Sequence, residues 1–284
     1  MSPIDPSALA SWRSWIGRQD TCTQLLDVTT LRRFAAAIGT NLTVERHWPA
    51  LGHWAYFQPV LPTQELGPDG HTKRGGFFPP VTLPRRMFAS AEIEWIEPLV
   101  INTIATARSL IAAVHHRTGR TGELVIVDVD RTIEQSGRIC VRERQAIVYG
   151  QAGTPIPAIT CASAAAENIW RPDPVELFRF SAATSNGHRI HYDYPYATQI
   201  EGYPALVVQG PLIAARLLGY AMANNPSPAS RYRFRAVAPC FVSQPITFTP
   251  GERPGQLRAV RCDGVVAMEA DAEFSMKITS ASEL

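Results

Sequence analysis

Alternating apolar and polar positions mark the end of each half of the chain. Residues 123–134 (ELVIVDVDRTIE) and 265–278 (VVAMEADAEFSMKI) contain β-branched residues and alternate with a period of two. This period places successive side chains on opposite faces of a strand, so each segment predicts one half-buried antiparallel strand. Residues 138–149 and 256–262 are expected to pair with them across short turns, so both halves end in a meander.

One segment has a different pattern. Residues 212–222 (LIAARLLGYAM) are apolar nearly all round, with Arg216 as the exception. A helix of this kind is buried rather than laid on a surface. Gly210 and Pro211 stand at its start, where proline suits the first helical position. The pattern therefore predicts a buried helix that opens at Gly210.

The order of elements occurs twice. Residues 31–37 (LRRFAAA) are echoed by residues 177–183 (LFRFSAA), and both read as short helices. Coincidence would explain this match alone, but two more matches follow in the same order, and repeats of this kind indicate duplication. They place a proline within an apolar run at 77–81 and 208–212, and at 96–101 and 237–242.

A stretch rich in Pro, Ala and Ser separates the halves. Residues 151–175 show no sustained period, which is typical of a linker. We therefore expect an N-terminal unit at 1–150 and a C-terminal unit at 176–284. A curved antiparallel sheet around a central helix is the hotdog arrangement, so two copies predict an α+β double hotdog.

The composition is that of an ordinary globular protein. The 284 residues are 45% hydrophobic and 18% charged, with 27 Lys and Arg against 25 Asp and Glu, so no nucleic-acid partner is implied. The N-terminus lacks a signal-like apolar region, and no run of about 18 apolar residues occurs. We expect a cytoplasmic protein without a membrane partner.

The cysteines are odd in number and scattered. They never show CxxC spacing, so neither a disulfide framework nor a zinc knuckle is indicated. We expect all of them to be reduced and mostly packed in the interior. They are Cys22, Cys140, Cys161, Cys240 and Cys262.

The densest polar cluster lies at residues 186–193 (NGHRIHYD), between two apolar elements. So many donors, acceptors and titratable groups are hard to justify by packing, because each needs a partner once buried. The cluster therefore predicts a functional site.

This cluster resembles the hydratase 2 motif of MaoC-like enoyl-CoA hydratases, in which an acidic residue lies five positions before a histidine. His191 matches the histidine, whereas Asn186 stands where the acid usually is. SNGHRIHYDYPYA and EGYPALVVQGPL resemble the branch of hydroxyacyl-thioester dehydratase type 2 and mesaconyl-CoA or itaconyl-CoA hydratases. GHWAYF, DGHTKRGGFFPP and LPRRMFA extend the resemblance over residues 20–277.

The resemblance implies a role for three residues. Hydration of an enoyl thioester needs a base for water, a proton for the α-carbon and donors for the enolate-like oxygen. His191 is the expected acid/base. Asn186 is expected to orient the water, and the amide of Gly210, at the positive end of the helix, to polarise the thioester carbonyl.

Substrate binding is expected from a further set of side chains. Arginines of the region are candidates for the CoA phosphates or a free substrate carboxylate. For Arg85 and Arg86 the alternative is that they lie in solvent at the start of the central helix of the first half. The expected set is Arg85, Arg86, His188, Arg189 and Tyr203.

Other polar residues have plainer interpretations. Asp193 would be a second carboxylate of the site, or it caps the following turn. A metal at His188 and His191 is not expected, since no third His or Cys lies nearby in sequence. His115 and His116 are expected at a strand end. No cofactor is expected apart from the coenzyme A of the substrate.

The implied activity is hydration of a short branched enoyl-CoA, itaconyl-CoA or mesaconyl-C(4)-CoA, to citramalyl-CoA. Two alternatives stay open: a hydratase or dehydratase of longer 3-hydroxyacyl thioesters, and a silent module that binds acyl thioesters. No His-x-Asp follows Gly39-Thr40-Asn41, so one site per chain is expected, with the first half shaping its pocket. A homodimer is plausible by resemblance.

Overall fold

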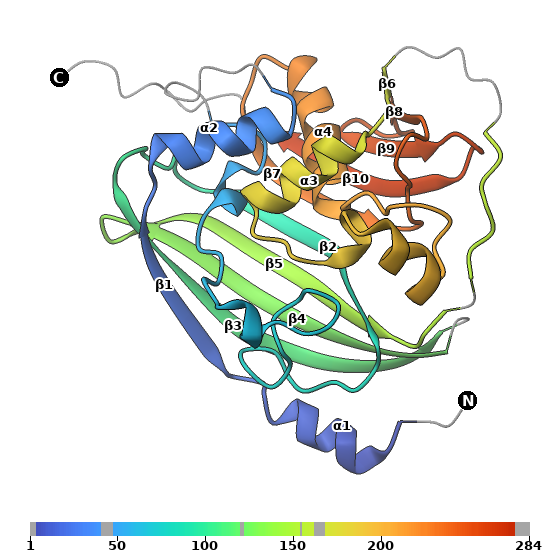
Figure 1. The fold of residues 1–284 in the computed structure, drawn as a ribbon. Coiled ribbons are helices and arrows are strands. Elements are labelled where there is room, and N and C mark those ends of the chain that lie inside the picture. The colour runs from blue at the N-terminus through green and yellow to red at the C-terminus, as the bar shows by residue number, and fades with distance from the viewer. Residues whose placement is uncertain (1–3, 41–47, 120–121, 154, 162–167, 276–284) are drawn as a thin grey trace.

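The computed structural model describes residues 4–40, 48–119, 122–153, 155–161 and 168–275. One antiparallel sheet of ten strands curves around the helices, in the order β1-β3-β4-β5-β2-β7-β10-β9-β8-β6 (Figure 1). The strands are β1 (Gln19–Leu25), β2 (Arg85–Trp95), β3 (Ile104–Gly119), β4 (Gly122–Gln135), β5 (Arg138–Gly150), β6 (Ile169–Trp170), β7 (Ala229–Ala236), β8 (Ile246–Pro250), β9 (Gln256–Arg261) and β10 (Val266–Phe274).

The two halves of the chain supply the two halves of this sheet. Strands β1 to β5 lie on one side and β6 to β10 on the other, and residues 90–94 of β2 pair with residues 231–235 of β7 at the seam. The fold is an α+β double hotdog, as the repeat predicts. The meander strands are confirmed as β4, β5, β9 and β10, and residues 276–278 of the last prediction lie outside the described residues.

The concave side of the sheet carries the helices. The predicted buried helix is confirmed as α4, which packs against β2, β7, β9 and β10 and buries residues on most of its circumference. The helical elements are α1 (Pro6–Arg13), α2 (Val28–Ala37), α3 (Pro174–Ala183), α4 (Gly210–Ala223), the 3₁₀ turns η1 (Gly52–Ala55), η2 (Thr63–Glu65) and η3 (Arg189–His191), and the π-helical turn η4 (Tyr196–Ile200).

The repeated helices α2 and α3 lie side by side (Figure 1). Each begins with an aspartate whose carboxylate accepts from the amide three residues on: Asp27 from Thr30 and Asp173 from Glu176, both at 2.9 Å. Phe34 and Phe180 meet between them, with ring centroids 5.9 Å apart. Equivalent capping and packing agree with the duplication.

The prediction of a helix at Arg85 and Arg86 is wrong. Both residues open strand β2, which pairs with β5 on one side and β7 on the other. Within β2, Ala91 and Ile93 are buried while Glu94 is exposed, so the period is two. Pairing to two distant strands is invisible in local sequence. The concave face here is filled by a compact segment with buried side chains, His53, Trp54, Ala55 and Tyr56.

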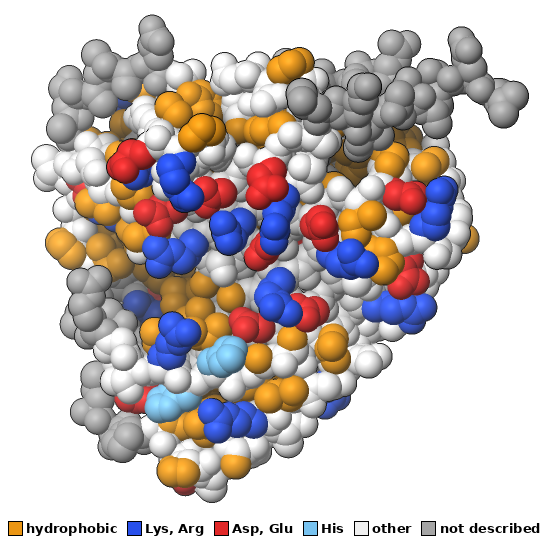
Figure 2. Space-filling view, turned by 180° about the vertical axis from the view of Figure 1, so that it is seen from behind, with side chains coloured by type: hydrophobic (Ala, Val, Ile, Leu, Met, Phe, Trp, Pro, Cys, Tyr) orange, Lys and Arg blue, Asp and Glu red, His pale blue; other side chains and the backbone are white. Residues whose placement is uncertain are grey.

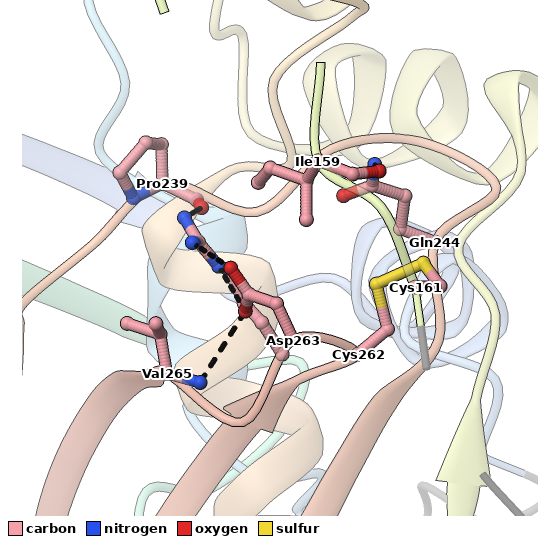
Figure 3. Close-up of a disulfide and its surroundings, with 8 residues drawn as sticks. Ile159, Cys161, Pro239, Gln244, Cys262, Asp263 and Val265 are labelled. Atoms are coloured by element: carbon pink, nitrogen blue, oxygen red, sulfur yellow. Dashed lines mark hydrogen bonds and ion pairs between the residues drawn. A yellow bond between two sulfur atoms is a disulfide. The ribbon is translucent and has the colours of Figure 1, made fainter. Parts of the chain in front are cut away.

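The predicted linker contains ordered structure and a crosslink. Strand β6 and the first residues of α3 lie within 151–175, and the predicted bounds of the two units stay a prediction. Cys161 is bonded to Cys262, 101 residues later, which corrects the expectation that all cysteines are reduced (Figure 3). Gln244 also holds this stretch through the carbonyl of Ile159. Cys22, Cys140 and Cys240 are free, as expected.

The rear face of the molecule carries charges of both signs. Figure 2 shows basic and acidic side chains interleaved rather than gathered by sign. Pairs between neighbouring strands include Arg231 with Glu92 and Arg235 with Glu269. Such pairs favour the register of the strands and leave no one-sign patch on this face. In the part of the chain that the structure describes, no helix is long and apolar enough to cross a bilayer.

Candidate active site

The polar loop predicted as a site connects α3 to η3. Helix α3 ends at Thr184, whose hydroxyl donates to the carbonyl of Phe180, and Ser185 then takes a left-handed conformation with φ of 50°. The next residue, Asn186, donates its amide to Ser181 and accepts from the amide of His188 at 3.1 Å. The Asn186 side chain therefore shapes the loop with its oxygen, and its NH₂ group remains available as a donor.

His191 is buried, with 7% of its surface exposed. Its Nδ1 lies 2.7 Å from the carbonyl oxygen of Val207. A carbonyl can only accept, so Nδ1 carries the proton and Nε2 keeps a free lone pair. Burial is the main reason that the pKa of His191 falls to about 4. A neutral imidazole with a free Nε2 is ready to act as a base.

The same segment leads from His191 to helix α4. Val207 donates its amide to Ile190 and accepts from His191, which ties η3 to the strand-like stretch before the helix. Gly210 begins α4 three residues later, and Pro211 follows it. Among the described residues the amide of Gly210 has no hydrogen-bond acceptor, so it is an open donor at the positive end of a helix.

A loop of the first half docks against this site. The amide of Arg189 donates to the carbonyl of Asp69 at 2.9 Å, and the Arg189 guanidinium donates to the carbonyl of Pro68. Gly70 and Gly187 face each other with no room for a side chain on either. The site is therefore built from both halves of the chain.

The docked loop brings a third histidine. The carboxylate of Asp69 accepts from Nδ1 of His71 at 3.0 Å. The ring of His71 lies on that of His188, with centroids 4.1 Å apart, and His188 lies edge-on to His191 at 5.3 Å. Sequence reasoning missed Asp69 and His71 as site residues. The signal was the DGHT segment, which is as polar and glycine-rich as the predicted loop.

Burial keeps the histidines of this row neutral at pH 7. It is the largest cause of the lowered pKa of His71, and with neighbouring His71 it lowers the pKa of His188 to about 2. The carboxyl of Asp69 behaves in the opposite way. Burial raises its pKa, but hydrogen bonds from the ring and the amide of His71 help to outweigh this effect and leave the pKa below its ordinary value.

One group in the described part of the chain has the spacing of metal ligands. Asp69, His71 and His188 offer atoms within 4.8 Å of one another. The Asp69 carboxylate is already engaged by the ring and the amide of His71. The expected absence of a metal stays a prediction. His191 and Asp193 are not part of this group, and Asp193 caps the next turn by accepting from the amide of Tyr196.

Two of the predicted binding arginines are already paired with carboxylates. Arg189 donates twice to Asp193, at 2.9 and 2.7 Å. Arg85 donates to the carbonyl of Glu201 and forms an ion pair with its carboxylate, while its guanidinium lies over the ring of Tyr203. These two ion pairs stabilise the loops in which the residues lie. Substrate contacts of Arg85, Arg189, His188 and Tyr203 remain predictions.

Arg86 is different. Its guanidinium lies 5.5 Å from the ring centre of Phe78, and its charge contributes to the lowered pKa of His71 and His188. Its charge also lowers the pKa of Tyr149, against the larger effect of burial, which raises it. In the described ranges no Asp or Glu forms an ion pair with it. Arg86 is therefore a cation beside the histidines that no carboxylate of the described residues neutralises.

Comparisons with known proteins agree with this geometry. The hydroxyacyl-thioester dehydratase type 2 family matches residues 48–242. Mesaconyl-C(4)-CoA hydratase of Chloroflexus aurantiacus is 40% identical over 278 residues, which cover 93% of this chain and 98% of that protein. A mitochondrial hydroxyacyl-thioester dehydratase type 2 of Schizosaccharomyces pombe is 33% identical over 115 residues, 38% of each chain.

Solved structures share the fold at lower identity. HtdX of Mycobacterium tuberculosis aligns with a TM-score of 0.66 at 18% identity, over 91% of this chain and all of that one. A MaoC-like dehydratase aligns with a TM-score of 0.64 at 14% identity, over 92% of this chain and 99% of that one.

Proposed function

Because this chain belongs to the hydroxyacyl-thioester dehydratase type 2 family and has the double hotdog fold of MaoC-like proteins, we propose that it is a hydro-lyase that adds water reversibly to a short branched enoyl-CoA. The observation that carries the proposal is the state of His191. It is buried, neutral and held through Nδ1, with Nε2 free to take a proton.

The residues around His191 fit the remaining steps. Nε2 takes a proton from water while the water oxygen bonds to the β-carbon of the substrate. The NH₂ group of Asn186 orients this water. Negative charge that moves to the thioester oxygen is stabilised by the open amide of Gly210 and by the helix behind it. With mesaconyl-C(4)-CoA, protonation of the α-carbon completes the addition; with itaconyl-CoA, whose C=C bond lies one carbon farther from the thioester, the proton goes to the terminal methylene instead.

The proposed substrates are mesaconyl-C(4)-CoA and itaconyl-CoA, each giving citramalyl-CoA. Mesaconyl-C(4)-CoA is in the name of the relative with 40% identity. Both substrates carry a free carboxylate on the carbon that gains the hydroxyl group. A cation must therefore lie near the base, and Arg86 meets this need because its charge acts on His71 and His188 and no described carboxylate pairs with it.

A second candidate is a dehydratase of longer 3-hydroxyacyl thioesters. The hydroxyacyl-thioester dehydratases type 2 of Schizosaccharomyces pombe and Saccharomyces cerevisiae support it, at 33% identity over part of the chain and 21% over most of it. The higher identity over nearly the full length favours the branched substrate. A silent binding module is the third reading.

Loss of the enoyl-thioester absorbance tests the three readings, with chromatographic detection of citramalyl-CoA for itaconyl-CoA, whose C=C bond is not conjugated with the thioester. The purified protein is given mesaconyl-C(4)-CoA, itaconyl-CoA and crotonyl-CoA in parallel, together with His191→Ala. His115→Ala is the matched control, since His115 is exposed and paired with Asp128. Turnover of the dicarboxyl substrates that only His191→Ala abolishes supports the proposal. Turnover restricted to crotonyl-CoA or longer chains supports the second candidate, and binding without turnover supports the silent module.

The homodimer and the cytoplasmic location predicted from the sequence stay proposals. Light scattering of the purified protein tests the first, and fractionation of the source cells tests the second.

A further inference from the structure

We propose that Asp69 and His71 form a second acid/base pair, which delivers the proton to the α-carbon and takes the place of the carboxylate that the motif lacks at Asn186. This inference rests on the proposed hydratase function. It assigns a catalytic role to the first half of the chain, beyond shaping the pocket.

The pair has the geometry of an oriented acid/base. Asp69 accepts from Nδ1 of His71 with one carboxylate oxygen and from the amide of His71 with the other, both at 3.0 Å. The first bond fixes the tautomer, so Nε2 of His71 is its titrating atom. A carboxylate on Nδ1 also stabilises the imidazolium that forms when Nε2 takes a proton.

Contacts between backbone atoms hold the Asp69–His71 pair at the site. The Gly70–Gly187 contact and the bond from the amide of Arg189 to the carbonyl of Asp69 fix this loop to the loop that carries His191. The carboxylate that would complete the motif is missing at Asn186, whose oxygen accepts from the amide of His188 instead. Asp69 is therefore the carboxylate that serves this row of histidines.

The charge of Arg86 provides a way for His71 to become protonated when the substrate binds. In the free protein burial, and then the charges of Arg86 and Arg74, lower the pKa of His71, against the pull of Asp69. A substrate carboxylate bound to Arg86 cancels that charge, so His71 takes up a proton together with the substrate. During hydration His191 gains the proton of water, the C=C electron pair moves toward the thioester, and His71 gives its proton to the α-carbon. Transfer of one proton from His191 to His71 restores the site.

The first test measures turnover of mesaconyl-C(4)-CoA by Asp69→Asn, His71→Gln and the double variant. We expect His71→Gln to lower kcat by about 100-fold or more with little change in KM. Asp69→Asn is expected to lower kcat less and to shift the pH profile. Because Asp69 acts through His71, the double variant should be no slower than His71→Gln. His115→Gln and Asp128→Asn are the matched controls, since they form an exposed His–Asp pair on β3 and β4.

The second test measures proton uptake. Binding of the saturated analogue methylsuccinyl-CoA is followed by calorimetry at pH 7 in buffers of different ionisation enthalpy. Wild type should take up a proton, and His71→Gln and Arg86→Gln should not. A folded His71→Gln variant with wild-type kcat, additive losses in the double variant, or unchanged proton uptake would overturn the pair. So would activity that disappears with chelator and returns with Zn²⁺, because Asp69 and His71 would then be metal ligands. An inactive wild type would instead refute the proposed function itself.

Discussion

A Cβ atom on Gly70 would lie 1.8 Å from the carbonyl oxygen of Gly187. This contact between two backbones joins the halves of the chain at the histidines. It explains why both loops carry glycine: any side chain would push the Asp69–His71 loop away from the loop of His191.

Gly70→Ala is therefore expected to impair the site. The new methyl group meets backbone, and φ at this position is +86°, so we expect a loss of about 1–3 kcal/mol of folding stability together with a lower kcat. Gly264→Ala separates the two causes, because Gly264 has φ of +83° and open space around it. Equal thermal stability and equal activity of the two variants would contradict the docked contact.

Stability should fall with acid because of the buried histidines. Burial lowers the pKa of His191 to about 4, below the value of about 6.5 in an unfolded chain. Between these values the unfolded state binds more protons, so the contribution of His191 is full above about pH 6.5 and is lost as the pH falls toward 4. Urea unfolding from pH 7.5 to 4.5 should show a weaker pH dependence for His191→Gln than for wild type. An imidazole of His191 that titrates near 6.5 by NMR would contradict the expectation.

Substitution of Arg86 should change substrate preference. Loss of a charge-assisted contact is expected to raise KM for mesaconyl-C(4)-CoA by about 10- to 100-fold in Arg86→Gln. Crotonyl-CoA has no free carboxylate and serves as the internal control, and Arg86→Lys should keep part of the preference. Parallel losses on both substrates would show that Arg86 only supports the fold.

Asn186 is expected to tolerate aspartate better than alanine. Asp at this position can accept the same bond from the amide of His188, and it restores the carboxylate of the motif. We expect Asn186→Asp to stay within several-fold of wild-type kcat and Asn186→Ala to lose about 10-fold or more. Steady-state rates with matched circular dichroism spectra check this, and full activity of Asn186→Ala would exclude Asn186 from water binding.

The Cys161–Cys262 disulfide should stabilise the protein without affecting turnover. It closes a loop of 101 residues, for which a contribution of about 2–4 kcal/mol is typical. Cys161→Ser should lower Tm at unchanged kcat, while Cys22→Ser, at a free cysteine, is the control. Peptide mapping without reductant shows whether the bond forms in the source cells. An unchanged Tm would contradict the expected stabilisation.

The sequence predicted those parts of the fold that depend on local pattern. The alternation at 123–134 and the apolar helix at 212–222 correspond to β4 and α4, and the repeated helices α2 and α3 meet through Phe34 and Phe180. The start of β2 at Arg85 was mistaken for a helix because its pairing with β5 and β7 is long-range.

Half of the candidate site could also not be predicted from the local sequence. His191 and Asn186 stand in one dense cluster, whereas Asp69 and His71 come from a loop more than a hundred positions earlier. Only the fold shows that the DGHT loop touches the NGHRIH loop. The disulfide was missed for the same reason, since distance along the chain hides a Cα–Cα separation of 4.8 Å.

The β2–β7 seam has a consequence for how such a site can evolve. Two identical hotdog chains paired across this seam would have to carry the same loop twice, so every substitution would act at two places. Covalent fusion of the repeats removes that symmetry. One copy was then free to keep the DGHT loop and the other the NGHRIH loop, and a single asymmetric site suits the asymmetric substrate proposed above.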